Sequence, residues 1–113
     1  VHIGEGTVIC CNCTVTVDVE IGRHVHINIH CTIGHDVILQ DYATLAPGVH
    51  VSGHVHLGKR VYVGTGAVFV NGSKENPIII GDDTIIGAGA VVTTSLSGGT
   101  WVGVPARPLH KGR

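Results

Sequence analysis

A six-residue repeat of large apolar residues runs through most of the chain and is the feature that most constrains its fold. The repeat begins at residue 3 and recurs at every sixth position up to residue 69. The next member would fall on residue 75 but falls on residue 80, so the stretch 70–79 contains a five-residue insertion. The members of this large series are Ile3, Ile9, Val15, Ile21, Ile27, Ile33, Leu39, Leu45, Val51, Leu57, Val63, Phe69, Ile80, Ile86 and Val92.

A second series of smaller residues follows four positions after the large ones. An amphipathic helix would repeat every 3.6 residues, and ordinary strands alternate every two residues between irregularly spaced turns. A period of six is met by a short strand followed by a tight bend, and we expect the glycine that often follows the large residue to ease that bend. The small series is Thr7, Cys13, Val19, Val25, Cys31, Val37, Ala43, Val49, Val55, Val61, Ala67, Thr84 and Ala90.

Three strand-and-bend units close a triangular coil of 18 residues, and successive coils stack at roughly 4.8 Å, the spacing of hydrogen-bonded strands. The sequence therefore predicts an all-β, single-stranded parallel β-helix of about five coils. One domain covers 1–113, with one external loop at 70–79. In this arrangement residue n lies beneath residue n+18, so Cys13 and Cys31 are predicted to be stacked core residues.

The composition agrees with a narrow, strand-built interior. The chain is 43% hydrophobic, yet it has no Met and only one Phe, one Trp and two Tyr, so β-branched residues carry its apolar content. A net charge of −1 without runs of like charge argues against nucleic acid or an anionic membrane as partner, and no apolar stretch reaches the length of a membrane span. The four cysteines form no CxxC pair, which favours reduced thiols and a cytoplasmic location. The opening in mid-repeat, without Met, predicts a piece of a longer protein.

Three motifs resemble those of the bacterial hexapeptide-repeat acyltransferases. They are NIHCTIGHDV at 28–37, DYATLAPG at 41–48, and IGAGAVV at 86–92 followed by GVPAR at 103–107. The likeness is to the branch that contains sialic-acid O-acetyltransferases and nucleotide-amino-sugar N-acetyltransferases. It implies coils that wind left-handed, although the general crossover rule favours right-handed ones. It also implies acetyl-CoA as co-substrate, a homotrimer, and an N-terminal nucleotide-sugar-binding domain that this chain lacks.

The resemblance assigns roles to particular residues. His35 takes the place of the general base, which removes a proton from the amine or hydroxyl of a sugar or nucleotide-sugar acceptor, and Asp36 is the acidic neighbour that raises its basicity. Acetyl-CoA contacts are implied at Thr44 (where relatives commonly have His), Thr65 and Ala88. The adenine end is expected near the segment from Gly103 to Pro105, with Arg107 or Lys111 available for phosphate.

The repeat itself adds Gly53, which the 18-residue rule places directly above His35. A missing side chain there would leave space beside the imidazole for an extended thioester arm. We also expect the amide of Gly53 to be free and to serve as an oxyanion donor.

Two other functions compete with acetyl transfer. The γ-class carbonic anhydrases share this fold, but their zinc motif needs a second His five residues after the Gly-His, where this chain has Gln40; His30 and His35 have that spacing in the wrong register. A catalytic zinc site needs three protein ligands, so no metal is expected. A non-catalytic trimeric scaffold is the third possibility. Six further histidines are predicted to face solvent or a subunit interface: His24, His26, His30, His50, His54 and His56.

Assembly is predicted from the flat outer faces. Several uncharged residues fall on outward positions, more than a lone small domain comfortably exposes. We expect a homotrimer with parallel axes and with His35 near a subunit boundary. The uncharged outward residues include Val17, Ile29, Ile38, Pro47 and Val68.

Overall fold

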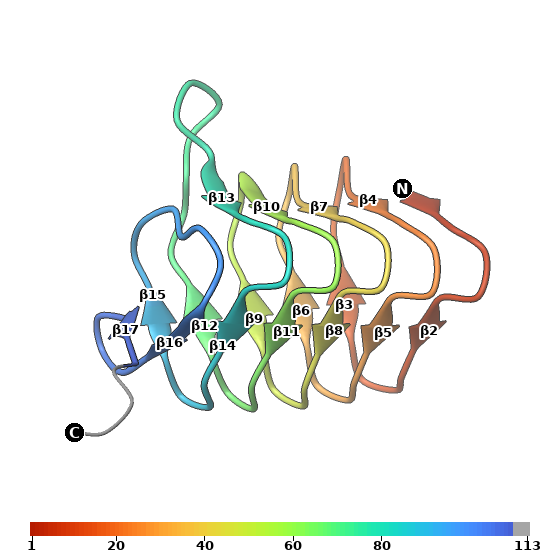
Figure 1. Cartoon of the computed structure of the whole chain (residues 1–113). Coiled ribbons are helices and arrows are strands. Elements are labelled where there is room, and N and C mark those ends of the chain that lie inside the picture. Colours follow the sequence, from red (N-terminus) through yellow and green to blue (C-terminus); the bar gives the residue numbers. More distant parts are fainter. Residues whose placement is uncertain (110–113) are drawn as a thin grey trace.

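The computed structural model describes residues 1–109 as a triangular prism of stacked parallel strands (Figure 1). Sheet A contains β1 (His2–Ile3), β4 (Glu20–Ile21), β7 (Ile38–Leu39), β10 (Val55–Leu57) and β13 (Ile78–Ile80). Sheet B contains β2 (Val8–Ile9), β5 (His26–Ile27), β8 (Thr44–Leu45), β11 (Tyr62–Val63), β14 (Ile85–Ile86), β16 (Thr100–Val102) and the antiparallel β17 (Arg107–Pro108). Sheet C contains β3 (Thr14–Val15), β6 (Thr32–Ile33), β9 (His50–Val51), β12 (Val68–Phe69) and β15 (Val91–Val92).

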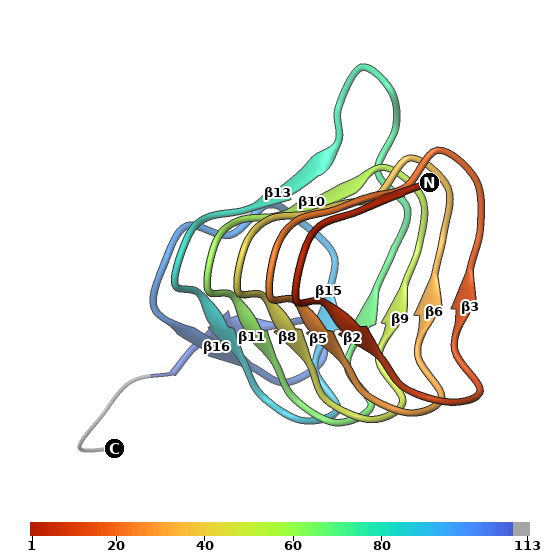
Figure 2. The same cartoon turned by 90° about the vertical axis from the view of Figure 1, so that its right-hand side faces the viewer.

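The strand register confirms the 18-residue coil. Ile3 pairs with Ile21 one coil further on, and across the insertion Leu57 pairs with Ile80. Five complete coils are followed by the start of a sixth at β16. Figure 2 looks along the prism from its N-terminal end, and the chain turns anticlockwise as it recedes, so the coils are left-handed.

The insertion forms the loop that projects beyond the prism between β12 and β13 (Figure 1). Its observed extent is 70–77, two residues shorter than predicted. The difference arises because Ile78 and Ile79 already pair with Val55 and His56 of β10, which places them in sheet A.

The two predicted apolar series fill the interior. From Val19 onward their members are buried, and Phe69, the one Phe of the chain, is 0% exposed. The prediction for the cysteines is confirmed: Cys31 is buried, and the Sγ of Cys13 donates to the carbonyl of Asn28 at 2.9 Å. Burial raises the pKa of the Cys31 thiol, as expected for a core residue. Only the first coil is open, because nothing covers it from below, and Ile3 is 52% exposed.

The bends are made differently from our expectation. The corner residue with left-handed backbone lies three positions after the large residue, and in most coils it is not glycine. The glycine directly after the large residue instead allows close stacking: a Cβ at Gly34 would lie 2.9 Å from the carbonyl carbon of Ser52, and one at Gly64 would lie 2.6 Å from the amide nitrogen of Ala88. The non-glycine residues in the left-handed region are Asn12, Asp18, His24, His30, Asp36, Tyr42, His54, Arg60 and Asp83.

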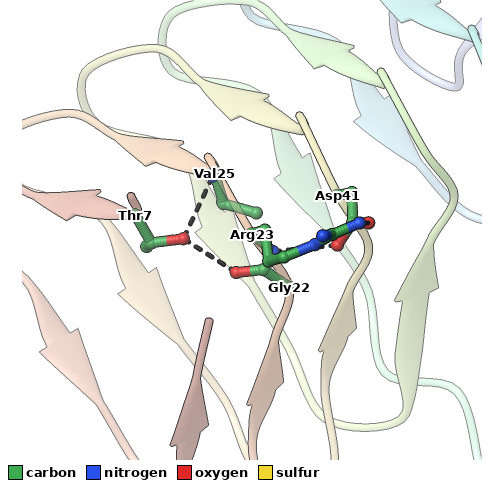
Figure 3. Close-up of polar contacts among 5 residues, drawn as sticks. All are labelled: Thr7, Gly22, Arg23, Val25 and Asp41. Carbon is green, nitrogen blue, oxygen red and sulfur yellow. Dashed lines mark hydrogen bonds and ion pairs between the residues drawn. The ribbon is translucent and has the colours of Figure 1, made fainter. Parts of the chain in front are cut away.

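Side chains at the corner between sheets A and B tie neighbouring coils together (Figure 3). Thr7 Oγ1 donates to the carbonyl of Gly22 at 2.7 Å and accepts from the amide of Val25 at 3.1 Å. The amide of Arg23 donates to Asp41 Oδ1 at 2.8 Å, and the two side chains form an ion pair at 3.2 Å. A carboxylate or hydroxyl from one coil therefore forms hydrogen bonds with backbone groups of a neighbouring coil. The hydrogen bond from the Arg23 amide is the main reason why the pKa of Asp41 is lowered.

No helix capable of crossing a membrane occurs within the part of the chain that the structure describes.

Candidate active site

His35 and Asp36 lie together on the corner between sheets C and A, after β6 and before β7. His35 Nδ1 is 2.9 Å from Asp36 Oδ2, and the two side chains are 52% and 44% exposed. The hydrogen bond from His35 is the main cause that lowers the pKa of Asp36, with smaller contributions from the charges of His54, His35 and Lys74. An ionised carboxylate can only accept, so in the neutral imidazole of His35 Nδ1 carries the proton and Nε2 keeps its lone pair.

Gly53 stacks on His35, as the 18-residue rule predicts. A Cβ built on Gly53 would overlap the imidazole, lying within 2.9 Å of its Nε2, Cε1 and Cδ2 atoms. The ring therefore rests against bare backbone, with Nε2 over the space that a side chain would occupy. The arrangement combines an imidazole, a carboxylate partner and bare backbone beside the basic nitrogen.

The expectation that the amide of Gly53 is free is wrong. It donates to Asn71 Oδ1 at 2.9 Å. Asn71 follows β12 near the start of the insertion loop. Its side chain accepts a hydrogen bond from a backbone amide of the preceding coil, as the side chain of Asp41 does from the amide of Arg23. An oxyanion could use this amide only after the Asn71 carboxamide has turned away.

His54 belongs to the site, although we predicted from the sequence that it faces solvent or a subunit interface. Its Nε2 lies 3.7 Å from Asp36 Oδ2, its ring meets the His35 ring edge-on at 5.0 Å between centroids, and 23% of its side chain is exposed. The 18-residue rule pairs residue 36 with residue 54 and could have found it. Among the described residues, these three side chains form the group of His, Cys, Asp or Glu that could hold a metal ion, with one donor atom each within 4.8 Å of the others.

His24, His30 and His50 lie away from this cluster, whereas His56 lines the same pocket as Asp36 and His54. His50 exchanges a hydrogen bond with Thr32 Oγ1 at 2.7 Å on sheet C, and His24 stacks on Tyr42 at the corner between sheets A and B. His30 lies on the corner between sheets B and C, so within one chain it is separated from His35 by sheet C.

A pocket on the outer face of sheet A opens directly beside the cluster. Asp36 and His54 form part of its wall. Lys74 reaches it from the insertion loop, and Glu20 and Ile38 line it from β4 and β7. A molecule held there would have both acidic and basic side chains within reach.

The residues expected to contact acetyl-CoA lie on a different edge of the prism. Thr44 is in β8 of sheet B, while Thr65 and Ala88 follow β11 and β14 at the corner between sheets B and C. Gly103 and Pro105 lie beyond them, between β16 and β17. A single chain places these residues along sheet B and its corner with sheet C but does not place them beside His35, because sheet C separates the two edges. Arg107 is exposed in β17, and Lys111 lies outside the described residues.

The corner between sheets B and C is unusually bare. Gly48, Gly66 and Gly89 stack along it with φ of 73°, 72° and 71°, and a Cβ on Gly66 or Gly89 would have no neighbour within 4 Å. Within residues 1–106, the strands of sheets B and C and the corner that joins them carry no Asp, Glu, Lys or Arg. The charged residues lie instead on sheet A, its two corners and the insertion loop.

Comparison with known proteins places the chain among acetyltransferases. It is 42% identical over 79 residues to GDP-perosamine N-acetyltransferase of Escherichia coli O157:H7, a match that spans 70% of this chain and 36% of that protein. Its structure superposes on WeeI from Acinetobacter baumannii AYE with a TM-score of 0.92 and 43% identity, covering 96% of this chain and 51% of WeeI.

A second structural relative carries bound ligands. It is a point mutant of perosamine N-acetyltransferase from Caulobacter crescentus in complex with CoA and GDP-perosamine, with a TM-score of 0.90 and 31% identity over 97% of this chain and 50% of that one. No family profile matches the sequence. The chain thus spans about half or less of the length of these relatives. The coil register, the motifs and these similarities agree, and the chain belongs to the hexapeptide-repeat acetyltransferase family.

Proposed function

We propose that this chain is the β-helical domain of an acetyl-CoA-dependent acetyltransferase that acts on an amine or hydroxyl of a sugar or nucleotide sugar. The observation that carries the proposal is the geometry of His35, whose Nδ1 is held by Asp36 while Nε2 stands over Gly53. The relative with bound CoA and GDP-perosamine supports this choice of substrates.

In the proposed reaction the acceptor nitrogen or oxygen attacks the thioester carbonyl of acetyl-CoA while His35 Nε2 takes its proton. The new C–N or C–O bond forms, the C–S bond then breaks, and the proton passes from the imidazolium to the departing CoA sulfur. Asp36 stabilises the imidazolium, because its carboxylate oxygen lies 2.9 Å from Nδ1 of the ring. Such a base contributes about 10²–10⁴-fold to the rate.

The active form is proposed to be a homotrimer, because one chain does not complete the site. The His35 edge and the edge with Thr65 and Ala88 are separated by sheet C, so the two can meet only across a subunit boundary. The absence of charged residues from sheets B and C, within residues 1–106, makes these faces suitable for such contact. The bare corner at Gly66 and Gly89 then lets an extended pantetheine arm approach backbone closely.

The acceptor is proposed to enter from the pocket on sheet A, which adjoins Asp36 and His54. An amino sugar brings a cation, and Glu20 in this pocket can attract it, while Lys74 suits a phosphate group. The need for acetyl-CoA, together with four unpaired cysteines, also favours a cytoplasmic location.

The proposal is tested by following CoA thiol release from acetyl-CoA in the presence of amino sugars and GDP-linked amino sugars, each with and without a chelator. Turnover that needs an acceptor and survives chelation is expected. Acetyl-CoA that neither binds, as judged by calorimetry, nor releases thiol with any acceptor would contradict it.

A further inference from the structure

Asp36 stands between two imidazoles, and only one of them has a part in the proposed reaction. Its Oδ2 is 2.9 Å from His35 Nδ1 and 3.7 Å from His54 Nε2. The second imidazole comes from the next coil, and the amide of His54 donates to the carbonyl of His35 at 3.1 Å. Backbone hydrogen bonding therefore fixes the separation of the two residues that flank the carboxylate.

The three donors have the spacing that a transition metal needs. A zinc ion at 2.0–2.1 Å from nitrogen and oxygen ligands in tetrahedral geometry sets its ligands roughly 3.3 Å apart. The two observed separations, 2.9 and 3.7 Å, fall on either side of that value. One donor atom from each residue lies within 4.8 Å of the others, so rotation of exposed or half-buried rings is enough to close the third side.

The chemistry of the donors also suits such an ion. Two imidazoles and one carboxylate form a common ligand set for divalent transition metals, with the remaining positions open to water. Oδ2 of Asp36 lies between the two imidazoles, 2.9 Å from His35 Nδ1 and 3.7 Å from His54 Nε2. The cluster is reached from the pocket on sheet A, which provides a route for the ion.

We propose that His35, Asp36 and His54 bind one divalent transition-metal ion, such as Zn²⁺ or Co²⁺, and that the bound ion inhibits acetyl transfer. The inhibitory half rests on the proposed function, because the ion would occupy or reorient the imidazole that must accept the acceptor's proton. The binding half does not depend on it. The ion is regulatory and takes no part in the reaction.

The test titrates Co²⁺ into the full chain without a polyhistidine tag, and follows visible absorption and calorimetry. One Co²⁺ per chain is expected, with the strong visible bands of a tetrahedral site that vanish when Zn²⁺ is added. His54→Asn removes one ligand at a left-handed backbone position (φ 57°) that Asn tolerates well. It should weaken binding at least about 10-fold, whereas the control His50→Asn, on sheet C, should bind as the wild type does.

Equal Co²⁺ affinity in the wild type and in His54→Asn would overturn the proposal, provided that thermal unfolding shows both proteins folded. A parallel activity assay separates the two halves. Zn²⁺ should inhibit the wild type at concentrations that fill the site and should inhibit His54→Asn only at higher ones. If the metal binds through His54 but does not slow turnover, the proposal of a binding site stands, and the role of His35 as base is contradicted.

Discussion

Replacing Gly53 by Ala tests whether the position of the His35 imidazole matters. The added Cβ would lie 2.6 Å from Cε1 of the ring and nearer still to Nε2, whereas ordinary van der Waals contact begins at 3.4 Å. The ring must therefore move by about 1.0 Å. A misplacement of about 1 Å in a reacting group costs on the order of 10²-fold in rate, and we expect a loss of this size in kcat/KM.

The fold should survive this change, because Gly53 does not have left-handed backbone and the atoms that must give way belong to an exposed side chain. Gly81→Ala is the matched control, since a Cβ there meets its nearest neighbours at 3.4–3.6 Å without a left-handed φ. Both variants are compared by steady-state kinetics and thermal unfolding. Full activity in a folded Gly53→Ala protein would refute the argument that the glycine positions the base.

Three further predictions concern acetyl-CoA binding, the assembly, and the contacts that join neighbouring coils at the corner between sheets A and B. Ala88→Leu should abolish acetyl-CoA binding measured by calorimetry while the melting temperature is retained, because the side chain would project from the bare corner; unchanged affinity would refute that placement. Light scattering at micromolar concentration should give the mass of three chains, and a monomer would refute the shared site. The pKa of Asp41 is lowered in the folded state, so its ionised carboxylate stabilises the fold above about pH 3.8, its ordinary value. This contribution is lost as the pH falls through the folded pKa. Asp41→Asn should therefore lower the melting temperature at pH 7. The difference in melting temperature between wild type and variant should therefore be smaller at pH 3. A difference that stays constant would contradict the stabilising role of the contacts between Asp41 and Arg23.

The core could be predicted from sequence because a period of six fixes both the direction of each side chain and its neighbour one coil away. The stack of Cys13 and Cys31, the pairing across the insertion and the contact between His35 and Gly53 all follow from that single number. His54 could have been predicted by the same rule, since it is 18 residues beyond Asp36.

Other features lay outside what the repeat can specify. The left-handed corner residues are mostly not glycine, so composition gave no sign of where the backbone bends. The hydrogen bond from Gly53 to Asn71 depends on the path of a non-periodic insertion.

The most direct test of the account compares His35→Ala with His50→Ala at saturating acetyl-CoA. His50 is also an exposed histidine, in β9 of sheet C just before Gly53, and it contacts Thr32 but not the cluster. If His35 removes the acceptor's proton, its loss should lower turnover by about 10²–10⁴-fold with little change in acetyl-CoA affinity, whereas His50→Ala should retain most of the activity. Comparable turnover in the two variants would contradict the assignment of His35 as the catalytic base.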